Sequence, residues 1–122
     1  MQIVPTLNFG GNCREAIQMY EKAFNGKISC IITYGEADDP AYNPLLEEEQ
    51  KEYIYHSELV LDNQRIIMSD HVDLEFQTCY SNFLTIMYDA KEEVQRAYEI
   101  MEEGSKTIYQ MEATPYSSCR VV

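Results

Sequence analysis

Two side chains that could take part in chemistry, an imidazole and a carboxylate, stand two residues apart in a run of β-forming residues. His56 and Glu58 lie in the segment 53–61, YIYHSELVL, and residues two apart in a strand share one face. An imidazole beside a carboxylate can act as a general base or ligate a metal ion. We therefore predict His56 and Glu58 as candidate catalytic residues. The alternative is a partly buried histidine that only bonds to its neighbour.

Other polar and aromatic side chains could border the same site. Asp70 and His71 end the next predicted strand, 64–69, and either edge a cleft or form a polar strand end. Five tyrosines of the predicted sheets mostly serve packing, and a cleft lined by tyrosine and methionine suits a planar or apolar ligand; they are Tyr53, Tyr55, Tyr80, Tyr88 and Tyr109. The residues predicted to bind the ligand are Tyr55, His56, Met68, Asp70 and Asn82.

The cysteines and histidines do not form a metal-binding motif. The four cysteines have neither CxxC nor CxxH spacing, so zinc-finger and thioredoxin-like sites are excluded; they are Cys13, Cys30, Cys79 and Cys119. We expect free thiols that act as small apolar groups. Two histidines are too few for a histidine-rich metal cluster.

The overall charge limits the partners. The 122 residues carry 21 acidic and 9 basic side chains and a net charge of −12, which repels nucleic-acid phosphates and anionic lipids. No stretch approaches the roughly 20 apolar residues of a membrane span. The N-terminus shows no basic region and no small-residue cleavage site, so we expect a cytoplasmic protein.

The first half of the chain predicts strand, helix and strand. Residues 2–9 are rich in β-formers, and apolar residues then recur with a period near 3.6. Asn12 and Glu15 have the spacing of a capping box at the start of this helix. Asn25-Gly26 suits its C-terminal end, and residues 27–34 form the next strand.

A long acidic segment follows, and then a hairpin. Residues 35–52, called here the acidic excursion, hold two prolines and seven carboxylates. The excursion is either a solvated spacer, with a helical turn near 45–51, or a functional loop, since loops of this length often carry function. Strands 53–61 and 64–69 follow, joined at Asp62-Asn63, because both residues tolerate a positive φ.

The second half repeats the order of the first. A strand at 79–88 leads to a helix with Asp89 as the predicted cap and Glu92 three positions on, and a strand at 105–112 follows Gly104. We therefore expect one domain, residues 1–122, made of two similar modules, 1–70 and 78–122. The glycine pair Gly10-Gly11 before the first helix fits neither the P-loop motif GxxxxGK[ST] nor the dinucleotide-binding motif GxGxxG, so we predict a simple corner.

These segments resemble a known family. LNFGGNCREAIQMYEKAFNGKI, then HSELVLDNQRIIMSDH after an acidic gap, then a second capped helix, is similar to the PhnB-like branch of the glyoxalase/bleomycin-resistance/dioxygenase (vicinal oxygen chelate) superfamily. The resemblance implies an α+β fold of two βαβββ modules, whose mixed, curved sheets enclose a cleft. It also implies a homodimer. TPYSSCRVV resembles the start of the last hairpin, so the second module lacks its last strand: either the chain is truncated, or a partner chain completes the sheet.

The resemblance also brings a metal site to test. Many members hold a divalent metal with His or Glu from the first and last strands of each module. The corresponding positions fall near Pro5 or Leu7, near Met68, and near Phe83 with Asn82 beside it. None of these is His, Asp or Glu, and hard divalent ions need oxygen or imidazole donors. We therefore predict no metal and no cofactor. Some relatives carry a methyltransferase label. This sequence has no glycine-rich turn that could bind S-adenosylmethionine, so we do not expect that activity.

Three functions remain open. The first is a metal-free module that binds an apolar or aromatic small molecule in the cleft, as a homodimer and without nucleic acid or membrane. The second is a metal-dependent lyase, isomerase or dioxygenase that uses His56, Glu58 and His71. The third is a structural role through dimerisation alone.

Overall fold

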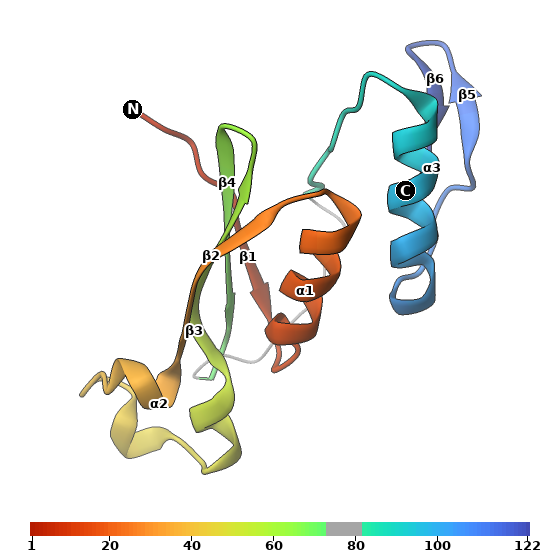
Figure 1. The fold of residues 1–122 in the computed structure, drawn as a ribbon. Helices are drawn as coiled ribbons and strands as arrows, with labels where there is room; N and C mark the ends of the chain where they lie inside the picture. The colour runs from red at the N-terminus through yellow and green to blue at the C-terminus, as the bar shows by residue number, and fades with distance from the viewer. Residues whose placement is uncertain (73–81) are drawn as a thin grey trace.

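The chain folds as a small α+β protein, described by a computed structural model for residues 1–72 and 82–122 (Figure 1). The strands are β1 Thr6–Phe9, β2 Lys27–Thr33, β3 Ile54–Leu61, β4 Gln64–Asp70, β5 Glu112–Thr114 and β6 Ser117–Arg120. The α-helices are α1 Cys13–Ala23, α2 Tyr34–Ala37 and α3 Lys91–Met101, and the 3-10 turns are η1 Asn43–Leu45, η2 Glu49–Glu52 and η3 Glu102–Gly104. None of the helices in these two ranges has both the length and the apolar character needed to cross a bilayer.

Four strands form one mixed, curved sheet in the order β1-β4-β3-β2. β1 runs parallel to β4, whereas the β2–β3 and β3–β4 pairs are antiparallel. The predicted β3–β4 hairpin is confirmed, with Leu61 opposite Gln64. At its turn Asp62 adopts a left-handed φ of 52°, as a short hairpin connection requires.

Helix α1 covers one face of this sheet and forms the core with it. Cys13 and Ile17 are fully buried against Leu59, Ile66 and Met68. These helical positions are four apart and therefore lie on the same side of α1. The apolar period predicted from the sequence is thus confirmed, and Figure 1 shows α1 lying between the sheet and α3.

The ends of both helices differ from the predicted capping boxes. Asn12 precedes α1, but its side chain makes no capping bond. α3 begins one residue later than expected, after Ala90, and again no side chain caps it. At the other end of α1, Asn25 takes the left-handed φ of 52°, while a Cβ on Gly26 would lie 2.6 Å from a methyl carbon of Leu61. Gly26 is therefore needed for close packing and not for its φ.

The second half of the chain does not form the predicted strands. The described part of segment 79–88, residues 82–88, is in no strand, and neither are residues 105–111. A β-strand requires backbone hydrogen bonds to a neighbouring strand, and none of the sheets formed by the described residues includes segment 82–88. Instead, β5 and β6 form a short hairpin that packs against α3.

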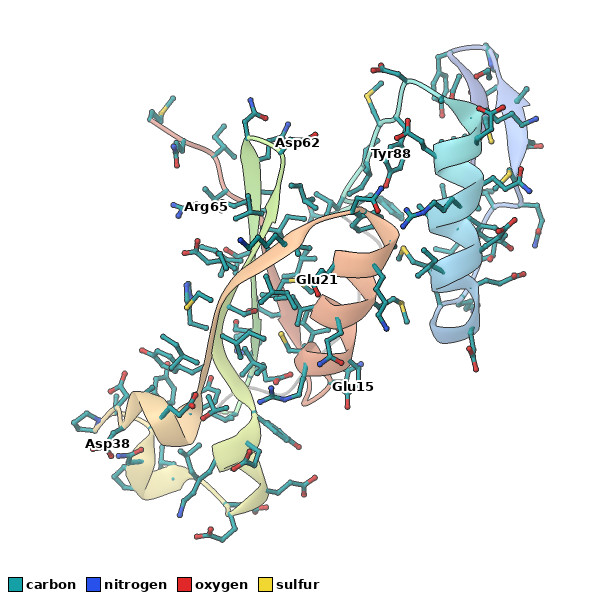
Figure 2. All side chains as sticks on the ribbon, viewed as in Figure 1. Glu15, Glu21, Asp38, Asp62, Arg65 and Tyr88 are labelled. Carbon is teal, nitrogen blue, oxygen red and sulfur yellow. The ribbon has the colours of Figure 1, made fainter. Side chains whose placement is uncertain are left out.

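Helix α3 is attached to α1 through one arginine. The Arg96 guanidinium donates to the main-chain oxygens of Ala23 at 3.1 Å and Lys22 at 2.8 Å, and to the Asn25 side chain at 2.8 Å. The last carbonyls of a helix have no partner within the helix and carry partial negative charge. Tyr88, labelled in Figure 2 on the segment that leads to α3, donates to the same Ala23 oxygen at 3.4 Å. A cation from the second half therefore caps the end of α1.

Candidate ligand-binding site

The acidic excursion folds back over one end of the sheet. Thr33 and Glu36 form a capping box, with reciprocal side-chain bonds of 3.2 and 2.9 Å. This short helix, α2, ends at Asp38, whose φ is 47°, and Figure 2 labels Asp38 at this end of the molecule. The Tyr34 amide donates to the Tyr53 carbonyl at 3.0 Å and so closes the excursion at its base.

The excursion and the sheet together border an open cavity of about 440 Å³. This volume lies in the range of pockets that hold small molecules. We call it the tyrosine cavity; the described residues that line it are Tyr34, Tyr42, Tyr55, His56, Ser69, Asp70 and His71.

Three tyrosine rings form one wall and hold each other in place. Tyr34 meets Tyr55 at 5.2 Å between ring centroids and Tyr42 at 5.5 Å, with the planes at 82° and 73°. Tyr42 and Tyr55 complete the triangle at 6.2 Å. Edge-to-face contacts place the positive ring edge against the negative ring face, which is a favourable arrangement. The cavity thus has a preorganised aromatic wall.

Two of these tyrosines are oriented by their hydroxyl groups. Tyr34 is buried and donates to the main-chain oxygen of Asp70 at 2.9 Å. Tyr55 donates to a carboxylate oxygen of Asp39 at 3.0 Å. This hydrogen bond, together with the negative charge of Asp39, raises the pKa of Tyr55 above its ordinary value of 10.0, because both favour the protonated phenol. Tyr55 therefore remains a hydrogen-bond donor through the neutral range.

Asp70 is among the residues that line the cavity, but its carboxylate is used inside the protein. One oxygen accepts from the amides of Gly11 at 2.8 Å and Cys13 at 3.0 Å, and the other accepts from the Ile54 amide at 2.9 Å. The side chain is almost completely buried. A carboxylate from β4 thus occupies the N-terminal end of α1, where Asn12 was the predicted cap, because hydrogen bonds to a charged acceptor are about twice as strong as neutral ones.

The same arrangement explains the glycine corner. Gly11 has a φ of +109°, and a Cβ there would lie 2.8 Å from the Tyr53 ring. The amides that a bound phosphate would need at this turn already donate to Asp70. Burial, followed by the nearby charge of Asp70, raises the pKa of the Cys13 thiol to about 12.

His56 and Glu58 share one face of β3, as their spacing predicted, and the structure shows that this face is opposite the buried side with Ser57 and Leu59. The Nε2 atom of His56 is 3.3 Å from one carboxylate oxygen of Glu58, and Arg65 Nη1 is 3.2 Å from the other. The imidazole is one-third exposed, and only the histidine of the three lines the cavity. Figure 2 labels Arg65 on the hairpin, towards its turn and away from the excursion.

Two other predicted ligand-binding residues lie elsewhere. Met68 is fully buried in the core under α1 and does not line the cavity. The sequence-based prediction placed Met68 on the cleft face of β4, whereas the structure places it on the core face. A shift of one residue along a strand moves a side chain to the other face of the sheet. Ser69 lines the cavity in its place. Asn82 is exposed and is not among the residues that line the cavity.

The positions expected to hold a metal do not fit one. Leu7 pairs with Met68 in the register of β1 and β4, and both belong to the core side. On the opposite side the same strands present Asn8 and Ser69, which hydrogen-bond to each other at 3.0 Å. Within residues 1–72 and 82–122 no group of three or more His, Cys, Asp or Glu side chains is placed to hold a metal ion.

The remaining predicted residues have other surroundings. Tyr53, Tyr88 and Tyr109 make packing or backbone contacts outside the cavity. Cys13, Cys30 and Cys119 are free thiols, the first and last of them buried. Cys79 and Tyr80 lie outside the described residues.

Sequence reasoning missed Tyr34, Tyr42 and Asp39 as parts of one site. Tyr34 stands at the end of a predicted strand, and the other two belong to the acidic excursion. The available signal was the length of that excursion, which is typical of a functional loop. Its path back over β3 could not be derived from residue spacing.

Comparison with known proteins identifies the fold. Neither a protein-family model nor a curated protein matches the sequence. Among solved structures, protein PA1353 from Pseudomonas aeruginosa is similar over 99% of this chain and 86% of its own, with 25% identity and a TM-score of 0.83. A PhnB protein from Bacillus cereus, named as a candidate 3-demethylubiquinone-9 3-methyltransferase, is similar over 98% of this chain and 87% of its own, with 18% identity and a TM-score of 0.75. TioX from Micromonospora sp. ML1 covers 99% of this chain and 86% of its own at 11% identity and a TM-score of 0.54.

These similarities show that the chain has a PhnB-like fold. The resemblance inferred from the sequence segments is thereby confirmed at the level of the fold. Because the match to PA1353 extends over nearly the whole chain, it includes the second half, with its extended segment 82–88 and its hairpin.

Proposed function

We propose that this protein binds a planar or apolar small molecule in the tyrosine cavity, within a glyoxalase-like scaffold that does not use the superfamily metal site. The observation that carries the proposal is the wall of three mutually oriented tyrosines in a cavity of about 440 Å³. Aromatic walls with a few oriented polar groups are typical of small-molecule sites. Here the polar groups are the hydroxyl of Tyr55, the hydroxyl of Ser69 and the two imidazoles.

A fragment screen by NMR tests this proposal. Planar aromatic and apolar fragments are added to the protein, and the ring signals of the cavity tyrosines are followed. We expect several fragments to shift these signals, and Tyr42→Ser to weaken their binding at least tenfold. Tyr116, which is 75% exposed and outside the cavity, provides the matched control Tyr116→Ser. The proposal fails if no fragment shifts the cavity signals, or if both variants weaken binding equally.

A second candidate function is catalysis by His56 with Glu58. It is favoured by the 3.3 Å contact between the two side chains at the border of the cavity. Glu58 would position the imidazole, and His56 would then move a proton to or from a bound molecule. The metal-dependent version of this candidate needs donors beyond those that the described residues bring together.

Metal analysis separates the metal-free proposal from the metal-dependent version of the second candidate. Protein purified without chelator is assayed for divalent ions beside the variant His56→Ala. We expect no stoichiometric ion in either preparation. A stoichiometric ion that disappears in His56→Ala would contradict the metal-free proposal and favour the second candidate.

We further propose that the working form is a homodimer in which the second copy covers segment 82–88, giving the two-module arrangement across two chains. Large apolar side chains of this segment are exposed, to 61% for Phe83 and 88% for Met87. Monomers rarely leave such clusters uncovered, and residues 82–88 have strand-forming composition but are in no strand, so a second copy could pair with them. Light scattering should give twice the chain mass, and Met87→Glu should give a monomer, whereas Leu45→Glu at another exposed apolar site should not.

A further inference from the structure

We infer that the tyrosine cavity prefers a cationic ligand, of the aryl or alkyl quaternary ammonium class, to a neutral or anionic molecule of the same shape. This inference rests on the proposed function and names the class of ligand. It combines three observations: the aromatic wall, the carboxylate that holds one of its hydroxyl groups, and the charge of the acidic excursion that borders the cavity.

The first observation is the amount of aromatic surface at one place. Tyr34, Tyr42 and Tyr55 are all among the residues that line the cavity, and their rings contact one another. The face of a tyrosine ring carries negative electrostatic potential and attracts cations that lie within about 6 Å of its centre. Quaternary ammonium groups suit such walls because they have no hydrogen-bond donors that water would have to satisfy.

The second observation is the bond between Tyr55 and Asp39. The phenol donates to a carboxylate at 3.0 Å, and a charged acceptor draws the proton away from the phenol oxygen. The ring therefore becomes richer in electrons, which strengthens its attraction for a cation. The raised pKa of Tyr55 has the same origin, since the proton is stabilised by Asp39.

The third observation is the local charge. The acidic excursion carries seven carboxylates and one lysine, a net charge of −6 out of −12 for the chain. Its lysine, Lys51, is paired with Glu48 at 2.6 Å. The field around the cavity is therefore negative, which attracts cations and repels anions.

Three aryl probes that differ in charge test the inference: benzyltrimethylammonium, benzyl alcohol and benzoate. Binding is measured by NMR titration of the tyrosine ring signals at pH 8 and low ionic strength, where surface charge is least screened. We expect benzyltrimethylammonium to bind about tenfold more tightly than benzyl alcohol, and benzoate to bind most weakly. Added salt at 0.5 M should reduce this preference.

Matched variants show whether the local carboxylate matters. Asp39→Asn removes the charge beside Tyr55, whereas Glu47→Gln removes the same charge from an exposed part of the excursion. We expect Asp39→Asn to weaken the ammonium probe about threefold to tenfold, and Glu47→Gln less than twofold. Tyr55→Phe keeps the ring and removes only the bond to Asp39, so it should also weaken the ammonium probe, even if Asp39→Asn impairs folding.

The outcomes separate this inference from the proposed function. If benzyl alcohol or benzoate shifts the tyrosine signals with equal or higher affinity, the preference for cations is overturned and the small-molecule site stands. If the two charge variants weaken the ammonium probe equally, the contribution assigned to Asp39 is overturned. If no probe shifts the tyrosine signals, both the inference and the proposed site are contradicted.

Discussion

Replacing Asp70 by asparagine should destabilise the protein severely, although the two side chains have nearly the same shape. The carboxylate accepts three main-chain hydrogen bonds, two at the start of α1 and one from Ile54 at the start of β3. An amide has one oxygen, so it can replace only one of the two acceptors. If that oxygen serves α1, the amide NH₂ group faces the Ile54 N–H, donor against donor.

The magnitude follows from these three bonds. Two of them change from charge-assisted to neutral, a loss of roughly 1 kcal/mol each, and the buried Ile54 donor left unpaired costs roughly 1–3 kcal/mol. The free energy of unfolding should therefore fall by about 3–5 kcal/mol. A chain of 122 residues has roughly 6–18 kcal/mol in total, so the variant would lose a large fraction of its stability.

Urea unfolding at pH 7, followed by circular dichroism, measures this loss. The midpoint should fall while the slope m stays constant, since the surface exposed on unfolding does not change. Asp62→Asn is the matched control, because it removes the same charge at an exposed turn whose left-handed φ asparagine tolerates. It should change stability by less than about 0.5 kcal/mol. A loss below 1 kcal/mol for Asp70→Asn would refute the structural role assigned to the carboxylate.

Three further changes test other parts of the fold. Gly11→Ala should cost about 2–4 kcal/mol by chemical denaturation, because its φ is +109° and the new methyl group would meet Tyr53, whereas Gly10→Ala should be tolerated. Arg96→Leu should cost only about 1 kcal/mol, since Arg96 is largely exposed, but hydrogen exchange should quicken in α3 and the β5–β6 hairpin and not in the main sheet. The Cys13 thiol, with its pKa near 12, should resist iodoacetamide at pH 8 in peptide mapping. Because its folded pKa lies above the ordinary 9.0, its contribution to stability is complete below pH 9 and lost as the pH rises towards 12, a loss that Cys13→Ala should reduce; rapid alkylation of the native protein would contradict this.

The sequence was sufficient for the elements whose residues interact with near neighbours. The apolar period of α1, the alternation of β3 and β4, and the turn at Asp62 depend on contacts within a few residues, and all are confirmed. Local rules failed where a distant group competed. Asn12 had the type and spacing of a cap, yet Asp70, 58 positions further along the chain, binds the amides at this end of α1.

The sequence also could not predict which residues of a strand face the core when both faces of the strand are partly apolar. Met68 alternates with Ile67 and Ser69, and only the position of α1 decides that Met68 enters the core while Ser69 borders the cavity. The second half shows the same limit for pairing. Residues 82–88 and 105–111 have strand-forming composition, but in the part of the chain that the structure describes neither segment is in a strand; of the two, 105–111 has backbone hydrogen bonds between Tyr109 and Val122, at 3.0 and 3.1 Å.

The candidate site illustrates both sides of this division. The sequence alone predicted that His56 and Glu58 share one strand face, because residue spacing determines this. It also predicted the acidic excursion as a separate segment, because composition determines that. The meeting of Tyr34, Tyr42 and Tyr55 with Asp39 was decided by the tertiary structure. The physical reason is that a long loop has many paths of similar local energy, and only its packing against the finished sheet selects one.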